Sequence, residues 1–343
     1  MMLTTKTFAP ASFLVLLSAG IFAAAQQPGT TSAPRSIALT DTANLISRGA
    51  KTEVVEYKGR KALHIITQPE RGSGITLLKD VDFRDGTIEV DIAAKVTTPP
   101  GVRMPGFIGI GFRARPDASR YELFYIRPNN SRSEDQAMRN HSVQYSSEPN
   151  FGWEVLRRQW PMVYESYTDL QPAEWTKVKI EVHGRRATLY LNGSPNPSLV
   201  VDGLKGEDLH GGIVLYSFVG EEAYYSNLKI TPAAPEPIKN GGEATGTWDV
   251  AFNTDAGRFK GTMTLTRDNT RLAGTWSGEL GNDVPVTGTW RDGYVELTFT
   301  GTWPDNKASA PIRLAGWIDD DSAHGRMKME GYAEGQWTAQ RQK

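Results

Sequence analysis

The sequence predicts an all-β protein of two domains, and three observations carry that prediction. Gly, Tyr and Trp are plentiful, with 34, 12 and 9 copies among 343 residues. Short runs of alternating apolar and polar residues follow one another, with turn residues about every 8–12 positions, while helical periodicity is scarce. The chain is also too long for one small core. We therefore expect sheets that are packed as two separate domains.

The N-terminal residues 1–25 have the parts of a secretory signal peptide. Lys6 supplies a positive charge, Phe13–Phe22 is an apolar run too short to span a bilayer, and Ala23–Ala25 is a small-residue cleavage site. Residues 26–36 form a polar leader that we expect to be flexible. No Cys follows the apolar run, so a lipid anchor is not expected. The sequence therefore predicts a secreted or periplasmic protein.

The composition argues against several kinds of site and partner. The chain has no Cys, so it has no disulfide, no thiolate nucleophile and no thiolate metal site. The formal net charge of −1 gives no attraction to nucleic acid or to an anionic membrane. Asp319–Asp321 lacks the alternating ligands of a calcium loop. We expect no cofactor. A structural Ca²⁺ is possible, but no motif supports it. The oligomeric state stays open.

The first domain is expected over residues 37–230, organised around Gly106–Tyr145. Two strands are predicted there, Phe107–Arg115 and Tyr121–Arg127, followed by a polar loop and a third strand at His141–Tyr145. Alternation in the second strand separates Glu122, Phe124 and Ile126 from Tyr121, Leu123, Tyr125 and Arg127. Charged, amide and aromatic side chains are dense here, as in a sheet face that meets a polar ligand.

Further strands are expected on both sides of this stretch, and two long segments, 97–104 and 146–163, are predicted as loops. The other strands are predicted at Thr52–Tyr57, Ala62–Thr67, Gly74–Leu78, Thr87–Val96, Glu174–Val182, Arg186–Leu191, Leu199–Val201, Gly212–Ser217 and Ala223–Ile230.

A Pro-rich linker at residues 231–243 leads to a second domain at residues 244–341. Gly-x-Trp or Gly-x-Met recurs there about every 9–15 residues, which is the length of one strand and one turn. About eight such strands close an up-and-down barrel. We expect the Gly to allow a bend and the large residue two positions on to fill the interior. Gly316-Trp317 is an imperfect member of the repeat.

Three charged residues on neighbouring predicted strands are the first site candidates: Arg113, Glu122 and Arg127. An arginine fork and a carboxylate can hydrogen-bond sugar hydroxyls, and Glu122 can act as an acid or a base. The alternative is a structural ion pair that joins two strands. Because Glu122 and Arg127 face opposite sides by alternation, not all three can line one site.

A second cluster consists of Arg139, His141, Gln144 and Tyr145. His141 and Tyr145 have the same parity, so we expect both to line one face. A His beside a Tyr on a ligand-facing strand can move protons near neutral pH. The alternative is a hydrogen-bonded structural His, and no second His stands at metal-ligand spacing from it.

Aromatic residues gather in or beside the predicted loop at 146–163, namely Trp153, Trp160, Tyr164 and Tyr167. They suit stacking against the C–H faces of sugar rings, or else a small core under the loop. Glu154 and Glu165 beside them are further candidate carboxylates. If the chain is an enzyme, Glu122, His141 and Glu165 are its predicted catalytic residues. The predicted ligand-binding residues are Arg113, Tyr125, Arg127, Arg139, Gln144, Tyr145, Trp153, Glu154 and Tyr164.

The first domain resembles the concanavalin A-like lectin/glucanase family, in its DUF1080 or 3-keto-disaccharide hydrolase-like branch, whose members are often labelled family-16-glycosidase-like. The resemblance is carried by the segments FRDGTIEVDI, GIGFR, YELFYIRP, RNHSVQY, EWTKVKIEV, ATLYLN and AYYSNLKI. It implies a jelly roll that binds sugar or hydrolyses glycosides. The second domain resembles lipocalin- or avidin-like barrels and transfers no site residues.

The chain departs from the catalytic pattern of family-16 glucanases, which is Glu-x-Asp-x-(x)-Glu on one strand. Glu89 and Asp91 fit the first two positions, but Ala93, Ala94 and Lys95 follow where the second Glu is needed. A retaining glycosidase needs two carboxyls about 5 Å apart. The leading hypothesis is therefore an exported carbohydrate-binding protein. The alternatives are a glycoside hydrolase, which the resemblance suggests acts on 3-keto-glycosides, and an envelope interaction protein without a sugar ligand.

Overall fold

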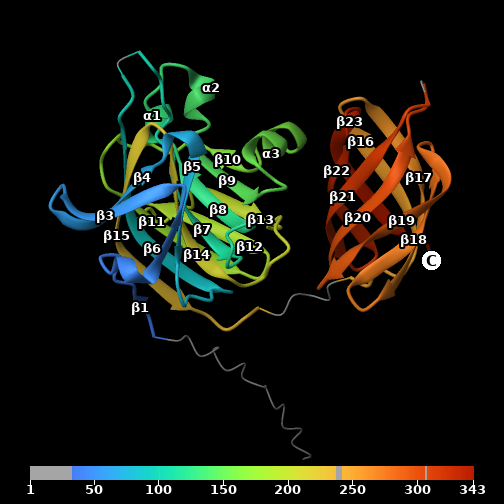
Figure 1. The fold of residues 1–343 in the computed structure, drawn as a ribbon, viewed down its shortest axis with the longest axis horizontal. Coiled ribbons are helices and arrows are strands. Elements are labelled where there is room, and N and C mark those ends of the chain that lie inside the picture. Colours follow the sequence, from blue (N-terminus) through green and yellow to red (C-terminus); the bar gives the residue numbers. More distant parts are fainter. Residues whose placement is uncertain (1–32, 100, 237–241, 306) are drawn as a thin grey trace, which may run out of the picture.

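The computed structural model describes residues 33–99, 101–236, 242–305 and 307–343. The predicted signal peptide, most of the predicted leader and part of the predicted linker lie outside the described residues. Two antiparallel sheets form a sandwich, and a closed barrel follows it along the chain (Figure 1). The predicted fold class, a jelly-roll sandwich followed by a small antiparallel barrel, is confirmed.

The first sheet of the sandwich has eight strands, in the order β13-β12-β11-β6-β15-β4-β3, with β1 paired to β15. Its strands are β1 (Arg35–Ser36), β3 (Ala50–Tyr57), β4 (Arg60–Thr67), β6 (Gly86–Val96), β11 (Thr176–His183), β12 (Arg186–Leu191), β13 (Leu199–Asp202) and β15 (Glu221–Pro232).

The second sheet has seven strands, in the order β10-β9-β8-β7-β14-β5-β2. Its strands are β2 (Leu45–Arg48), β5 (Ser73–Leu78), β7 (Ile108–Ala114), β8 (Tyr121–Ile126), β9 (Val143–Glu148), β10 (Glu165–Ser166) and β14 (Gly212–Phe218). Two short 3₁₀ turns, η1 (Thr42–Asn44) and η2 (Pro69–Arg71), lie between strands near the N-terminus.

The main core lies between the two sheets. Alternate residues of each strand point into it, and on β8 these are Phe124 and Ile126, which pack with Phe112 of β7 and Val143 of β9. The opposite face of the seven-stranded sheet, called the outer face below, carries a smaller apolar cluster that includes Leu123. The seven-stranded sheet is therefore apolar on both sides, with its polar groups near the ends of its strands.

Three short helices replace predicted loop and strand between residues 128 and 163. They are α1 (Pro128–Ser131), α2 (Gln136–Arg139) and α3 (Trp153–Gln159). The first two are four residues each, too short to show a helical period. The Asp135 side chain caps α2 by accepting a hydrogen bond from the Ala137 amide. The third predicted strand accordingly begins at Val143 and not at His141.

The second domain is a closed barrel of eight consecutive strands, as the repeat predicts. Its strands are β16 (Gly246–Thr254), β17 (Gly257–Asp268), β18 (Arg271–Gly278), β19 (Gly281–Arg291), β20 (Tyr294–Thr302), β21 (Ser309–Asp319), β22 (Ser322–Met329) and β23 (Ala333–Arg341). Trp248, Trp276 and Trp337 are buried in its interior. A Cβ at Gly261 would lie 2.5 Å from the Trp276 ring, so this Gly makes room for the Trp.

The imperfect repeat at Gly316-Trp317 departs from that rule. Trp317 is buried but lies outside the interior cluster, stacked edge-on against Tyr294 at 5.2 Å. The guanidinium of Arg185, from the jelly roll, lies 4.0 Å from the centre of the Trp317 ring. The outer surface of the barrel at β20–β23 is therefore the side that meets the jelly roll. Among the described residues, no helix is long and apolar enough to cross a membrane.

Candidate functional site

Strand β8 divides the predicted site residues between two sides of the seven-stranded sheet. Leu123 and Tyr125 belong to the outer-face cluster, whereas Phe124 packs in the main core. The alternation predicted for this strand is therefore correct. Only residues that share the side of Tyr125 can form one site with it.

A carboxylate, an imidazole and a guanidinium meet at the β10 edge of the sheet. Glu165 pairs with Gln144 of β9 in the sheet register, and its side chain is only 2% exposed. Arg157 of α3 donates to it through Nε and Nη2, at 3.1 and 2.7 Å. His141 Nδ1 lies 2.8 Å from Glu165 Oε2. A buried carboxylate thus lies between a guanidinium and an imidazole, and the imidazole can titrate near neutral pH.

A second cation, Arg127, lies on the same face. Its Nη2 donates a 2.9 Å hydrogen bond to Gln144 Oε1, and its guanidinium lies 5.3 Å from the centre of the Tyr125 ring. Burial lowers the pKa of Arg127, and its Nε has no hydrogen-bond partner among the described residues. Its guanidinium is therefore a buried positive charge beside Gln144 and Tyr125. We call Arg127, His141, Gln144, Arg157 and Glu165 the polar cluster.

Aromatic rings form the floor beside the polar cluster. Tyr125 packs against Phe107 and Tyr216, and Phe107 packs against Phe218, at ring-centre distances of 5.7, 6.1 and 4.7 Å. Tyr121 joins them on β8. Within the described chain, no hydrogen bond is recorded for the hydroxyls of Tyr121, Tyr125 or Tyr216. Such a floor offers rings for sugar C–H groups and hydroxyls for sugar oxygens.

Glu148 is a carboxylate that the sequence analysis did not single out. It ends β9 and pairs with Tyr121, on the same side as Gln144 by strand alternation. Burial raises the pKa of Glu148. Burial also raises the pKa values of Tyr125 and Tyr216, and the charge of Glu148 adds to that rise. The alternating residues Gln144, Ser146 and Glu148 were the sequence signal that would have placed Glu148 on the same face as Gln144. It was lost because residues from 146 on were predicted as loop.

The electrostatics of the polar cluster favour a neutral imidazole. Burial is the main cause that lowers the pKa of His141, and Arg157 and Arg127 lower it further, against the opposing charge of Glu165. At neutral pH the ring is therefore unprotonated. With Nδ1 turned to Glu165, Nε2 is the nitrogen left to act on a ligand.

Helix α3 brings one aromatic ring to this region. Trp153 is 39% exposed, and the Arg157 guanidinium lies 4.7 Å from its ring centre. Tyr167 is likewise exposed. Trp160 and Tyr164 behave differently, because Tyr164 is buried in the main core and Trp160 packs on it at 6.1 Å. Of the predicted aromatic platform, Trp153 and Tyr167 are therefore exposed, whereas Trp160 and Tyr164 belong to the packed interior.

Arg113 is a structural residue, which corrects its prediction as a ligand contact. Its Nη2 lies 2.8 Å from Asp85 Oδ1 and also donates to the carbonyls of Arg84 and Gly184. A β-bulge at this end of β7 and a φ of 53° turn its side chain away from the outer face. This is the ion-pair alternative considered from the sequence.

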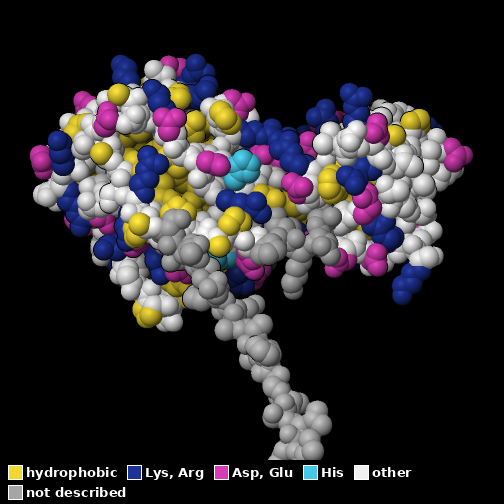
Figure 2. All heavy atoms as spheres, turned by 90° about the horizontal axis from the view of Figure 1, so that it is seen from below, with side chains coloured by type: hydrophobic (Ala, Val, Ile, Leu, Met, Phe, Trp, Pro, Cys, Tyr) yellow, Lys and Arg dark blue, Asp and Glu magenta, His cyan; other side chains and the backbone are white. Residues whose placement is uncertain are grey.

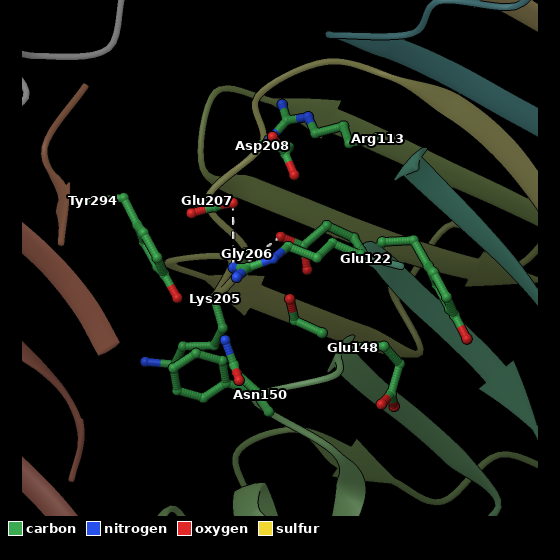
Figure 3. Close-up of a pocket in the computed structure, with 13 residues that line it drawn as sticks. Arg113, Glu122, Glu148, Asn150, Lys205, Gly206, Glu207, Asp208 and Tyr294 are labelled. Carbon is green, nitrogen blue, oxygen red and sulfur yellow. Dashed lines mark hydrogen bonds and ion pairs between the residues drawn. The ribbon is translucent and has the colours of Figure 1, made fainter. Parts of the chain in front are cut away.

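Glu122 and Tyr145 also lie away from the outer face, so the prediction that His141 and Tyr145 share a face is wrong. His141 sits in the turn after α2, where strand parity does not apply. The Glu122 carboxylate accepts hydrogen bonds from the Tyr145 hydroxyl, at 2.5 Å, and from the Gly206 amide, at 2.8 Å. It lines a small polar pocket closed by Tyr294 of the barrel (Figure 3).

That pocket holds charged groups whose pKa values are moved by burial. Burial raises the pKa of Glu122 and lowers the pKa of Lys205 to about 8. The Lys205 ammonium lies 4.3 Å from the centre of the Trp160 ring. The pocket belongs to the junction between the domains, and Glu122 is not placed to meet a ligand of the outer face.

Two further predicted ligand contacts lie off the polar cluster. Arg139 donates to the carbonyls of Ser133 and Glu134, so it braces the loop before α2. Glu154 is exposed in the first turn of α3, and no ion pair is recorded for it among the described residues. Of the predicted site residues, the structure brings together Tyr125, Arg127, His141, Gln144 and Glu165, with Trp153 at the rim.

The strand that resembles the family-16 pattern lies in the other sheet. Glu89 of β6 pairs with Lys229, and Asp91 pairs with Arg60. Both are ion pairs within or beside the eight-stranded sheet, remote from the outer face of the seven-stranded one. Over the described residues, no three His, Cys, Asp or Glu side chains gather as a set of metal ligands.

Comparisons with known proteins agree with this architecture. The chain matches the family described as the 3-keto-alpha-glucoside-1,2-lyase-like domain over residues 42–231. This confirms the resemblance to 3-keto-disaccharide hydrolase-like proteins. A search of curated proteins found no match.

Several solved structures are similar at low identity. The carbohydrate-binding module CBM66 from Bacillus subtilis is 17% identical, with 53% of this chain and 95% of that chain covered and a TM-score of 0.35. A protein of unknown function with a galectin-like fold, from the same organism, is 11% identical, covering 61% and 99% at a TM-score of 0.42. A putative glycosyl hydrolase from Parabacteroides distasonis is 13% identical, covering 56% and 90% at a TM-score of 0.34. Likeness this low says nothing about function.

The family match spans the sandwich from η1 to β15, without the two-residue strand β1, and covers more than half of the chain. It includes every residue of the polar cluster and the aromatic floor. The chain therefore belongs to the 3-keto-alpha-glucoside-1,2-lyase-like domain family.

Proposed function

We propose that the outer face binds 3-keto-glycosides and catalyses 1,2-elimination, with His141 as the base. The observation that carries the proposal is the His141–Glu165 pair at 2.8 Å, set between two arginines on a partly buried sheet face. The family description supplies the substrate class and the reaction. The residues of the sequence alone favour a sugar binder over a hydrolase. The polar cluster adds a reason for chemistry, because it holds a neutral base beside cations.

The chemistry follows from the ketone at C3 of such a sugar. The carbonyl makes the hydrogen at C2 acidic, so a neutral imidazole can remove it as a proton and leave an enolate. When the C3 carbonyl re-forms, the electrons make a double bond between C1 and C2. The bond from C1 to its oxygen then breaks, and the departing alkoxide takes up one proton from solvent. The products are a 2-hydroxy-enone and an alcohol, and no oxidant or reductant is consumed.

Each member of the polar cluster has a part in this scheme. The Glu165 carboxylate lies 2.8 Å from Nδ1 of His141, so its charge stabilises the imidazolium once formed, and Nε2 is the nitrogen assigned to the substrate. Arg127 carries an Nε without a hydrogen-bond partner within the described chain, and its positive charge suits the oxygen where the enolate charge gathers. Tyr125 supplies a ring and a hydroxyl between these groups and Glu148.

A direct assay tests the proposal. The full chain is mixed with methyl 3-keto-α-glucoside, and formation of the conjugated enone is followed by its near-ultraviolet absorbance. Methyl α-glucoside is the matched control, because without the ketone its C2 hydrogen is not acidic. The proposal expects enone from the first sugar only. Saturable binding without any product would instead support a carbohydrate-binding protein, and release of 3-keto-glucose without enone or C2 exchange would support a hydrolase.

The pH profile of kcat/KM gives a separate prediction. His141 must be unprotonated to act, and its folded pKa is lowered from 6.5 by burial. We expect kcat/KM to rise with pH on the acid side, with an inflection below pH 6.5, and to be level near neutrality. A profile that falls with rising pH through this range would mean that the protonated imidazole acts, against the proposed role.

Glu148 is expected to contact the leaving sugar. On β9 it lies four positions from Gln144, about 13 Å along the strand, so the two side chains bracket a space longer than one sugar ring. We expect Glu148→Gln to raise KM for a 3-keto-disaccharide about tenfold, since a hydrogen bond to a charged group is weakened. KM for methyl 3-keto-α-glucoside should change little. An equal loss on both substrates would contradict this placement.

A further inference from the structure

We propose that the barrel positions helix α3 of the jelly roll, and through it the arginine that holds Glu165 in the polar cluster. This gives the second domain a role in the first domain's site. Its activity test rests on the proposed function, but the proposal itself concerns the order of α3 and can be measured without any substrate.

Helix α3 contacts the polar cluster with one side and the barrel with another. On one side Arg157 donates to Glu165 at 2.7 Å and lies over Trp153. On the other side Arg158 and Gln159, the next two residues, meet the barrel. Because neighbouring residues of a helix are turned about 100° apart, one short helix serves the polar cluster and the barrel at once.

The barrel contacts α3 and the segment just before it through β22 and β23. Glu334 Oε1 lies 2.6 Å from Arg158 Nη2. Gln336 donates from Nε2 to the backbone carbonyl of Gln159. Arg326 donates to the backbone carbonyl of Asn150 at 2.6 Å and also lies 3.3 Å from Glu334. Gln159 is the last residue of α3 and Asn150 lies three residues before its first, so the barrel contacts the C-terminal end of the helix and the segment that leads into it.

Helix α3 needs such support because it is weak by itself. It has seven residues, and its N-cap Gly152 makes no side-chain capping bond. Isolated helices shorter than about 12–15 residues are marginal in water, and helices in proteins depend on packing. Inside the jelly roll it is fixed by Leu156, which is buried in the main core. The contacts from the barrel hold the turn that carries Arg157 and Arg158.

The barrel surface that faces the jelly roll, around Tyr294 and Trp317, has buried aromatic rings and paired charges. Tyr294 and Trp317 point outward from the barrel, yet they are 2% and 1% exposed. Among the described residues, four ion pairs cross between the domains: Arg120–Glu296, Arg158–Glu334, Arg185–Asp319 and Arg291–Asp208. Figure 2 shows basic and acidic side chains side by side where the two domains meet. The barrel is thus held in a defined orientation by charge pairs around buried aromatic rings.

The test is Glu334→Arg in the full chain, which places a third cation beside Arg158 and Arg326. Hydrogen exchange of the amides of Leu156 and Trp160, which are bonded within α3, reports its order. We expect exchange of α3 to speed up about tenfold or more. On methyl 3-keto-α-glucoside, kcat should fall about tenfold with KM nearly unchanged, because the His141–Glu165 pair loses its brace but the sugar contacts remain.

Three companion variants make the result specific. Arg158→Glu together with Glu334→Arg restores the ion pair in reverse and should recover both α3 protection and kcat. Glu330→Arg introduces the same charge on the barrel at a residue that pairs with Lys328 and not with α3, so it should change neither. Gln336→Ala removes one surface hydrogen bond without a charge change and should give a smaller rise in exchange.

Wild-type exchange of α3 in both Glu334→Arg and Gln336→Ala would overturn the proposal. Thermal unfolding of each variant confirms that the barrel is still folded when the exchange is read. If no 3-keto-glycoside is turned over by the wild type, the proposed function fails, but the exchange experiment still decides whether the barrel positions α3.

Discussion

Replacing His141 by Ala is expected to lower kcat on a 3-keto-α-glucoside by about 10²- to 10⁴-fold, the usual contribution of a general base. The imidazole Nε2 is the group proposed to take the C2 proton, and Glu165 has no second imidazole beside it in the part of the chain that the structure describes. KM should stay within a few-fold of the wild type, because Arg127, Gln144 and the tyrosine floor still hold the sugar. Steady-state kinetics of enone formation measures both constants.

His210→Ala is the matched control, since His210 is exposed and pairs only with Asp82. It should have wild-type kinetics. If His141→Ala keeps its kcat while Glu148→Gln loses it, the base is Glu148 and the assignment of His141 is wrong. If both variants keep their kcat, the outer face is not where the reaction occurs.

Replacing Arg113 by Met is expected to destabilise the jelly roll by about 3–5 kcal/mol, the cost of breaking a buried ion pair from one side. The side chains of Arg113 and Asp85 are 1% and 0% exposed. Without the guanidinium, the Asp85 carboxylate keeps only the amides of Gly184 and Glu236 as donors, and the carbonyls of Arg84 and Gly184 lose theirs. Denaturant unfolding of the full chain, followed at the first domain's transition, measures the loss.

Arg186→Met is the control for that experiment, because its pair with Asp202 is largely exposed and should be worth no more than about 1 kcal/mol. Sugar affinity per folded molecule should be unchanged in Arg113→Met, since the guanidinium does not reach the outer face. A small stability loss combined with lost affinity would return Arg113 to the ligand contacts predicted from the sequence.

Much of the fold could be predicted because its signals are regular. Strand β8 alternates without interruption, so the sides of Glu122 and Tyr125 were assigned correctly. The Gly-x-Trp repeat predicted the eight-stranded barrel, because its spacing is that of one strand and one turn, and at Gly261 the missing side chain leaves room for the Trp276 ring. Trp317 broke the repeat, and it is the position where the barrel's outer surface carries a buried aromatic residue against the jelly roll.

The candidate site was harder to predict, because its residues come together through irregular elements. His141 was assigned by strand parity, but it follows a capped four-residue helix. Arg113 sits at a bulge that redirects its side chain. Arg157 reaches Glu165 from a seven-residue helix inside a segment read as loop. None of these local conformations has a period long enough to be read from one sequence.

Export, the absence of a cofactor and the absence of a nucleic-acid partner stay predictions from the sequence. The oligomeric state stays open. The signal peptide on which export depends lies outside the described residues. The carbohydrate-binding or glycosidase-like character of the first domain agrees with its family.

The central claim is that a base on the outer face removes the C2 proton of a 3-keto-glycoside, and proton NMR of the reaction in D₂O tests it most directly. Methyl 3-keto-α-glucoside is incubated with the full chain, with His141→Ala and with buffer alone. We expect the wild type to abolish the C2 hydrogen signal in every product molecule, at a rate far above the other two samples. Product that retains its C2 hydrogen would mean that the glycosidic bond is cleaved without proton abstraction, and would contradict the account.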